Sequence, residues 1–213
     1  LHGQKIGVIG RTGAGKSSLV SALTLLFDNI EGQIFINGEL INDKDKKLIR
    51  KNISYLSQDS YFFEGTLREN INPLGDIDDN SLITLLKEAE IYKKFENQKG
   101  LDYMLSGNKM NLSQGEMQIL CFIRIISSAK NIVILDEATA NIDIDSEHIL
   151  EKMKNLYLKN KTVITIAHRL NTVYDCDKII ILESGEIKTF ANIKDLSDED
   201  KKYFDNYIQQ MLE

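Results

Sequence analysis

Gly10-Arg-Thr-Gly-Ala-Gly15-Lys16-Ser17 decides the fold, because it matches the pattern G-x-x-x-x-G-K-[ST] at every fixed position. An apolar run at 5–9 precedes it, and leucines spaced like one face of a helix follow it. In this context the glycines let backbone N–H groups converge on phosphate oxygens, and the helix points its positive end at the same anion. Lys16 would contact the terminal phosphates, and Ser17 would bind Mg²⁺. The stretch therefore predicts a site for a nucleoside triphosphate.

The composition narrows the class of protein further. The chain has 213 residues, of which 42% are hydrophobic and 27% charged, so it can bury a core and is not of the disordered class. Its net charge of −6 argues against a nucleic-acid-binding protein, which would normally carry a basic surplus. Two cysteines argue against a disulfide-rich scaffold. No apolar run approaches the roughly 20 residues of a membrane-spanning helix, so we expect this stretch alone to be soluble.

Strand-like and helical patterns alternate along the chain. Short apolar runs predict strands at 5–9, 33–37, 53–56, 132–135, 162–166 and 178–182. Helical spacing predicts helices at 17–27 and 145–157 and a helical block at about 78–130. Such alternation is typical of parallel βαβ units, with the block as an inserted lobe. We therefore predict one α/β domain with a mostly parallel sheet, a core at about 1–77 and 131–213, and a helical lobe at about 78–130.

Two local signals add detail to this outline. Asn37-Gly38 is a typical two-residue turn of a β-hairpin. The acidic stretch 195–205 predicts a solvated terminal helix.

The strand predicted at 132–135 is followed by two adjacent carboxylates, Asp136 and Glu137. In a parallel sheet the ligand lies beyond the carboxyl ends of the strands, so Asp136 would lie near a metal ion. Glu137 projects differently, because strand side chains alternate, and could act as general base toward the attacking water. A pair of helix-capping acids is the alternative, and the phosphate loop makes the catalytic interpretation the stronger one.

Four more motifs follow in a fixed order: Leu56-Ser-Gln58-Asp59, Asn111-Leu-Ser113-Gln-Gly115-Glu116, Ala140-Asn-Ile-Asp143 and Ile166-Ala-His168-Arg169-Leu170. With the loop and the acidic strand, the pattern resembles the ATP-binding cassette of ABC transporters, over about residues 5–196. These four motifs look like the Q-loop, the signature, the D-loop and the switch histidine of that family. The resemblance implies a P-loop NTPase fold with a RecA-like core, and ATP hydrolysis.

The resemblance also implies the roles of individual residues. ATP would be bound by Gly10, Arg11, Thr12, Gly13, Ala14, Gly15, Lys16, Ser17, Ser18 and Gln58. Mg²⁺ would be bound by Ser17, Gln58 and Asp136, and catalysis would rest on Glu137, His168 and Lys16. The signature residues Ser113, Gln114, Gly115 and Glu116 would meet ATP bound on a second cassette, and Asp143 would lie in the D-loop. Transmembrane domains would be the other partner, placing the cassette at the cytoplasmic face of a membrane, without nucleic acid.

Several of these residues also have structural interpretations. Gln58 could cap a turn, and His168 could be a structural histidine. Ser113 and Glu116 match a capping box that opens a helix at about 117–126. The family usually has Gln where this chain has Glu116, and an extra negative charge near a nucleotide favours weaker hydrolysis at the site that this signature completes.

The loop, Gly65-Thr-Leu-Arg-Glu-Asn70-Ile-Asn-Pro73 and Asp136-Glu-Ala-Thr139 resemble the C subfamily of ABC transporters, the multidrug-resistance-associated type. A retained Glu137 with a deviant Glu116 is similar to the second cassette of that subfamily. The segment 61–70 would then contact transmembrane helices, although its aromatic residues could equally pack within the lobe.

We therefore expect the motor domain of an exporter. The alternatives are a soluble ABC-type ATPase without membrane domains and a regulatory cassette that barely hydrolyses ATP. Family cassettes normally have β-strands and an adenine-stacking aromatic residue before the phosphate loop, so we also expect a missing N-terminal edge, a truncated β-subdomain and weakened adenine recognition.

Overall fold

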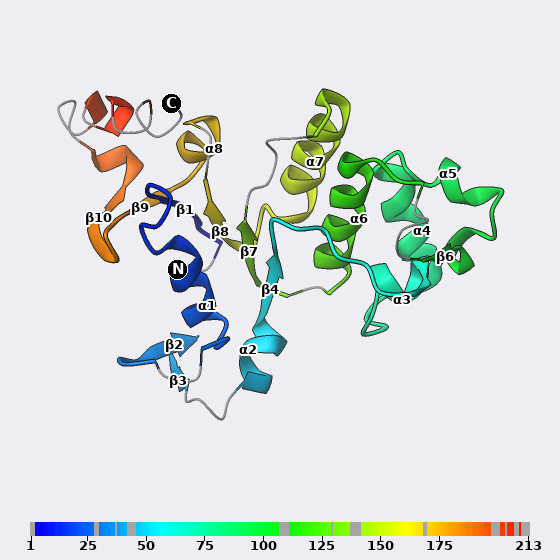
Figure 1. The fold of residues 1–213 in the computed structure, drawn as a ribbon, viewed down its shortest axis with the longest axis horizontal. Helices are drawn as coiled ribbons and strands as arrows, with labels where there is room; N and C mark the ends of the chain where they lie inside the picture. The colour runs from blue at the N-terminus through cyan, green and yellow to red at the C-terminus, as the bar shows by residue number, and fades with distance from the viewer. Residues whose placement is uncertain are drawn as a thin grey trace. The chain divides into compact units, whose positions relative to one another are not determined.

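The computed structural model describes residues 3–27, 30–36, 38–41, 46–106, 111–128, 130–136, 142–167 and 170–196, together with 201, 202, 204–206 and 209. Contacts between residues divide the chain into two units, both drawn in Figure 1. Unit 1 comprises 1–54, 131–137 and 161–213, and unit 2 comprises 55–130 and 138–160. Unit 2 extends beyond the helical lobe expected at about 78–130, because 55–77 and 138–160 group with it.

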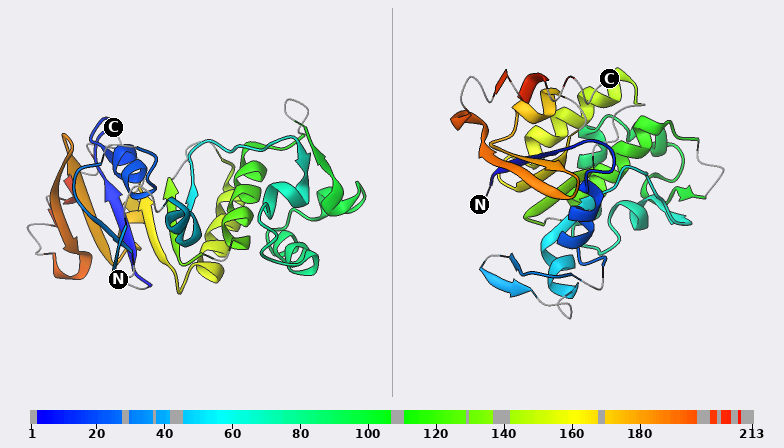
Figure 2. Two further views of the ribbon diagram at one scale, coloured as in Figure 1. Left: turned by 90° about the horizontal axis from the view of Figure 1, so that it is seen from below. Right: turned by 60° about the vertical axis from the view of Figure 1, so that its left-hand side comes forward.

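Unit 1 contains most of a six-stranded sheet, whose last strand continues into residues 55 and 56 of unit 2 (Figure 2, left). In spatial order its strands are β10 (Glu186–Asn192), β9 (Lys178–Glu183), β1 (Lys5–Ile9), β8 (Thr162–Ile166), β7 (Ile132–Asp136) and β4 (Ile53–Leu56). In this sheet β1 pairs in parallel with β8 and β9, β7 pairs in parallel with β8, and β10 pairs antiparallel with β9. The inner strands are rich in buried Ile and Val, as strands covered on both faces are. The mostly parallel sheet confirms the predicted α/β class.

The helix after the loop is shorter than predicted. α1 (Lys16–Leu23) ends early because Leu25 adopts a φ of 50° and the N–H of Leu26 donates to Ser21 O over 2.8 Å. This bond closes a Schellman-type helix end. Leu25 is thereby buried, whereas Leu26 and Phe27 are 65% and 50% exposed. The prediction of a helix to residue 27, packed through Leu26 and Phe27, is wrong over its last turn.

The smaller elements of unit 1 include a hairpin. β2 (Ile34–Ile36) and β3 (Glu39–Ile41) pair antiparallel with Ile36 opposite Glu39, which confirms the hairpin predicted from Asn37-Gly38. The remaining elements are α2 (Lys46–Asn52), α8 (Leu170–Tyr174) and the 3-10 helix η5 (Ile193–Asp195).

The C-terminal stretch corrects one expectation. Phe204 is only 2% exposed and packs in a core cluster with Ile9, Ala167, Val173 and Ile179. The stretch at 195–205 is therefore not simply solvated, because the side chain of Phe204 is anchored in the core of unit 1.

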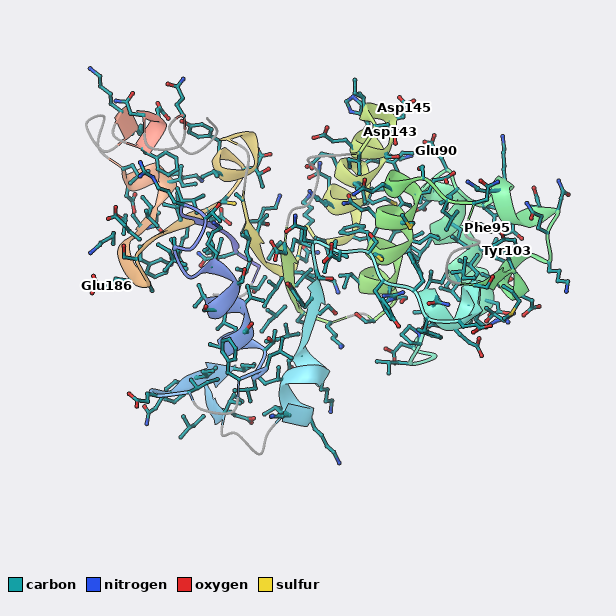
Figure 3. All side chains as sticks on the ribbon, in the orientation of Figure 1. Glu90, Phe95, Tyr103, Asp143, Asp145 and Glu186 are labelled. Atoms are coloured by element: carbon teal, nitrogen blue, oxygen red, sulfur yellow. The ribbon has the colours of Figure 1, made fainter. Side chains whose placement is uncertain are left out.

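Unit 2 is mainly helical among its described residues. Its elements are β5 (Gly65–Thr66), α3 (Leu67–Ile71), α4 (Asp79–Glu88), α5 (Lys93–Glu96), the 3-10 helix η2 (Gly100–Asp102), β6 (Met104–Leu105), α6 (Gln114–Ser127) and α7 (Ile144–Tyr157). The apolar α6 packs against α3, α4 and α7. Phe95 and Tyr103, labelled in Figure 3, add a ring contact with centroids 5.2 Å apart. No helix in the described part of the chain is both long and apolar enough to cross a membrane.

Candidate active site

The predicted phosphate loop connects β1 to α1, as the motif requires. Gly13 and Gly15 have φ of 82° and 101°, a region that glycine adopts without strain. A β-carbon at Gly13 would meet no heavy atom within 4 Å, so the surface of the loop is open there. Ala14 is buried instead, and its N–H donates to Arg11 O over 2.9 Å. The loop is thus a closed turn with an accessible backbone on its outer side, and Arg11 and Thr12 are exposed on it.

The first turn of α1 is suited to an anion. Its N-cap is Gly15, which makes no side-chain capping hydrogen bond, and its first turn contains no acidic residue. The first N–H groups of a helix have no partner within the helix and carry the positive end of its dipole. Ser17 and Ser18 in this turn are exposed. A phosphate group would supply the acceptors that the first turn of α1 lacks.

Lys16 is held inside the loop. Its ammonium group donates to Gly10 O over 2.6 Å and to Arg11 O over 3.1 Å, and the residue is 9% exposed. Burial lowers the pKa of Lys16, and the negative charge of Asp136 acts in the opposite direction. A phosphate oxygen is a stronger acceptor for an ammonium group than a neutral carbonyl. Lys16 can therefore transfer these hydrogen bonds to a bound phosphate.

Asp136 lies at the same edge of the sheet as the loop. It is opposite Ile166 in the β7–β8 register, and Ile166 is opposite Val8 in the β8–β1 register. The row Asp136–Ile166–Val8 therefore lies two residues before Gly10. Since the three strands are parallel, the loop and the carboxylate leave the sheet on one side, as predicted.

A turn that the sequence analysis did not single out supports the loop. Ser184 and Gly185 have φ of 50° and 84° and join β9 to β10, and the Gly185 N–H donates to Ala14 O over 3.0 Å. A β-carbon on Gly10 would lie 2.5 Å from Leu182 O, so the loop and the end of β9 are in close contact. Ser-Gly between two strands is a known turn signal, and it would have revealed both the hairpin and β10.

These residues fit a magnesium–triphosphate. The loop offers backbone N–H groups and an ammonium group to phosphate oxygens. Ser17 and Asp136 offer a hydroxyl and a carboxylate, the hard oxygen ligands that Mg²⁺ prefers. Both lie in unit 1 beside the same loop.

For three predicted site residues, the approach to this loop stays a prediction. Gln58 follows β4, is exposed and belongs to unit 2, so its approach to a metal stays a prediction. Glu137 and His168 lie outside the described residues. They stand directly after Asp136 and two positions after Ile166, respectively.

The signature residues open α6 in unit 2 as the capping box predicts. Ser113 is the N-cap, and its Oγ accepts from the Glu116 N–H over 3.1 Å. In return, Glu116 Oε2 accepts from the Ser113 N–H over 2.7 Å. Gln114 is exposed in the first turn and Gly115 is buried.

Asp143, which is predicted to lie in the D-loop, is the N-cap of α7 (Figure 3) and borders α6 at Gly115. It accepts from the N–H and the hydroxyl of Ser146 over 2.9 and 2.8 Å, and these bonds lower its pKa, with the backbone bond as the larger cause. A β-carbon on Gly115 would lie 2.7 Å from Asp143 Oδ2 and 2.6 Å from Ser146 Cβ. Signature and D-loop thus touch within unit 2, an arrangement that spacing alone did not reveal.

The aromatic segment before α3 divides into two kinds of residue. Phe62 is 7% exposed and lies under the Arg124 guanidinium at 5.2 Å, whereas Tyr61 and Phe63 are 72% and 40% exposed. Arg124 also donates to Tyr61 O over 3.0 Å, and Asn70 accepts from the Phe63 N–H over 3.0 Å. The segment is therefore fixed to unit 2 through Phe62 and its backbone, with the other two rings turned outward.

Comparisons with known proteins agree with these motifs. Residues 1–140 match the family model described as ABC transporter. ABC transporter C family member 3 of Dictyostelium discoideum is 42% identical over 188 residues, or 88% of this chain and 13% of that protein. Metal resistance protein YCF1 of Saccharomyces cerevisiae is 37% identical over 203 residues, which are 94% of this chain and 13% of that protein. ATP-binding cassette sub-family C member 4 of Homo sapiens is 37% identical over 209 residues, 98% of this chain and 16% of that protein.

The chain thus spans only 13–16% of the length of these relatives. Its matched region contains the phosphate loop and the acidic strand end that the structure brings to one edge of the sheet. The chain therefore belongs to the ABC transporter family, as an ATP-binding domain similar to those of C-family, multidrug-resistance-associated transporters.

Proposed function

We propose that the chain is the ATP-hydrolysing motor of a transporter and that it works with a second cassette. The proposal rests on the groups that lie at one edge of the unit 1 sheet. There an uncapped helix N-terminus, the buried Lys16 and the carboxylate of Asp136 surround one loop. Together they form a phosphate site with an acidic group beside it, which is what triphosphate chemistry requires.

In the proposed mechanism, the loop N–H groups and Lys16 bind the β- and γ-phosphates and fix their orientation. Mg²⁺, held by Ser17, Asp136 and Gln58, would neutralise charge on the phosphate oxygens when bound. Glu137 takes a proton from the attacking water, and His168 donates a hydrogen bond to the γ-phosphate. Positioning and charge stabilisation then carry most of the rate enhancement.

The second cassette completes the site. The first turn of α6, capped by Ser113, would face the γ-phosphate of ATP bound on the partner, and the partner's signature would face the ATP of this chain. ATP binding favours the closed pair and hydrolysis reopens it, so the nucleotide shifts a conformational equilibrium.

We propose that the opening and closing of the cassette pair moves transmembrane domains that are bound to it. The exposed rings of Tyr61 and Phe63, on a segment fixed by Arg124, support docking of a membrane partner there. The transporter is proposed to be an exporter of the C subfamily, which the C-family relatives support as to subfamily. The retained Glu137 beside the deviant Glu116 supports its assignment as the second cassette, which would lie at the cytoplasmic face of a membrane.

A regulatory cassette with weak hydrolysis is the second candidate, and Glu116 favours it. A carboxylate in the signature places negative charge where a triphosphate would dock, which costs affinity for the closed state.

Substituting Glu137→Gln tests the proposal. ATP binding should persist, because the glutamine leaves the loop intact, whereas phosphate release should fall by about 10²-fold or more. The variant should also accumulate as an ATP-dependent dimer. Normal hydrolysis by the variant would exclude Glu137 as the base, and a wild-type chain that binds ATP without releasing phosphate would favour the regulatory cassette.

A further inference from the structure

The unusual acid of the signature has a cationic partner in unit 2. Lys94, on α5, lies with its Nζ 2.5 Å from Glu116 Oε2, and the two side chains are 33% and 27% exposed. The same oxygen accepts from the Ser113 N–H over 2.7 Å. The carboxylate is therefore bound twice, once by the capping box and once by an ammonium group.

Without Lys94, the first turn of α6 would be strongly negative. Glu116 is part of that turn, and Asp143 borders it at Gly115. Asp143 is engaged by Ser146, which supplies no positive charge. Carboxylates at a helix N-terminus offset the positive potential that attracts an anion, so the turn would oppose an approaching triphosphate.

We propose that Lys94 is a positioning residue of the signature, which neutralises Glu116 and keeps its carboxylate on the cap of α6. The first turn can then meet a triphosphate on a partner cassette despite the acid at position 116. This inference rests on the proposed function, because it concerns the same contact with the ATP of a partner.

The geometry indicates that the Lys94–Glu116 interaction is stronger than an exposed surface ion pair. Exposed pairs between long side chains contribute little, because water screens them and their side chains lose entropy. Here both side chains are about two-thirds buried, and the acceptor oxygen is already fixed by a backbone N–H. Charge-assisted hydrogen bonds of this kind are strong and directional.

The test uses ATP-dependent self-association, with a second copy of this chain as the partner cassette. In the Glu137→Gln background, sedimentation velocity gives the ATP concentration that half-saturates dimer formation. Lys94→Met removes the charge and keeps most of the length of the side chain, whereas Lys94→Arg keeps the charge. Glu116→Gln keeps the cap and removes the acid. Lys93→Met is the matched control, because Lys93 is the exposed neighbour of Lys94 on the same helix.

Lys94→Met should raise the half-saturating ATP concentration about tenfold, which corresponds to about 1.4 kcal/mol. Lys94→Arg and Lys93→Met should stay within about twofold of the parent. In the Glu116→Gln background, Lys94→Met should have no further effect, because no acid is left to neutralise. A purely structural role of Lys94 would instead give the same loss in both backgrounds.

The proposal is overturned if Lys94→Met associates as well as Lys93→Met, or if Glu116→Gln does not rescue it. Failure of the proposed function would give a different result: the Glu137→Gln chain with no other substitution would not form dimers at any ATP concentration. That result would refute the inference as well, since no signature–nucleotide contact would exist.

Discussion

Gly115→Ala tests the contact between the signature and the D-loop. In an open helix this substitution stabilises, because alanine is favoured over glycine by about 0.5–1 kcal/mol. Here the new β-carbon would lie 2.6 Å from Ser146 Cβ and 2.7 Å from Asp143 Oδ2, much closer than van der Waals contact. The sign of the effect therefore reports whether α6 and the N-terminus of α7 touch at this point.

Overpacking of a buried site costs about 1–3 kcal/mol, so we expect a net loss of about 1–2 kcal/mol after the gain in helix propensity. For a chain of this size, that loss lowers the melting temperature by about 2–8 °C. Circular dichroism melts of Gly115→Ala and of Gln114→Ala provide the comparison. Gln114 is the exposed neighbour in the same turn, and its variant should stay within about 0.5 kcal/mol of the parent.

A second substitution locates the cause of the loss. Ser146→Gly removes one of the two obstructing side chains, so Gly115→Ala should cost less in that background, with a coupling of about 1 kcal/mol. An unchanged or raised melting temperature for Gly115→Ala in the parent chain would refute the close contact.

Three further perturbations follow from the structure. Gly10→Ala places a β-carbon 2.5 Å from Leu182 O, so we expect a loss of about 1–3 kcal/mol in urea unfolding together with weaker ATP binding; retained stability would contradict this packing. Asn70→Ala removes a fully buried side chain that accepts a hydrogen bond from the Phe63 N–H, and the unfolding free energy should fall by about 2 kcal/mol, with no change as the opposing outcome. Hydrogen bonds lower the pKa of Asp143, so its charged cap stabilises the fold at pH values above the ordinary pKa of aspartate. This contribution is lost as the pH falls through the lowered pKa, below about pH 4. The stability advantage over Asp143→Asn in urea melts should therefore shrink on acidification, and an advantage that grows would contradict this assignment.

Most of unit 1 could be predicted from local patterns. β1, the loop and the acidic strand end each have a signal within a few residues, and the parallel pairing follows from their alternation with helices. The capping box of α6 was also predictable, because Ser113 and Glu116 interact within a single turn.

The parts that were missed depend on tertiary packing. α1 ends at Leu23 because Leu25 is drawn into a core cluster, although the apolar pattern continues to Phe27. Phe204 is buried by residues of three distant segments, which composition alone does not reveal in an acidic stretch.

The contacts of Glu116 and Asp143 in unit 2 also could not be predicted from the sequence. Lys94 and Glu116 are 22 positions apart, and Asp143 and Gly115 lie on different helices. No local pattern connects such pairs, so charge compensation at Glu116 became visible only in the structure.

Nucleotide titration of the chain tests whether the loop is a triphosphate site. ATP with Mg²⁺ should bind at least about tenfold more tightly than AMP, because the loop recognises the β- and γ-phosphates. Lys16→Met should remove most of this difference, since Lys16 is the ammonium group held in the loop. Equal affinities for ATP and AMP, or an unchanged preference in Lys16→Met, would contradict the assignment of the loop as a triphosphate site.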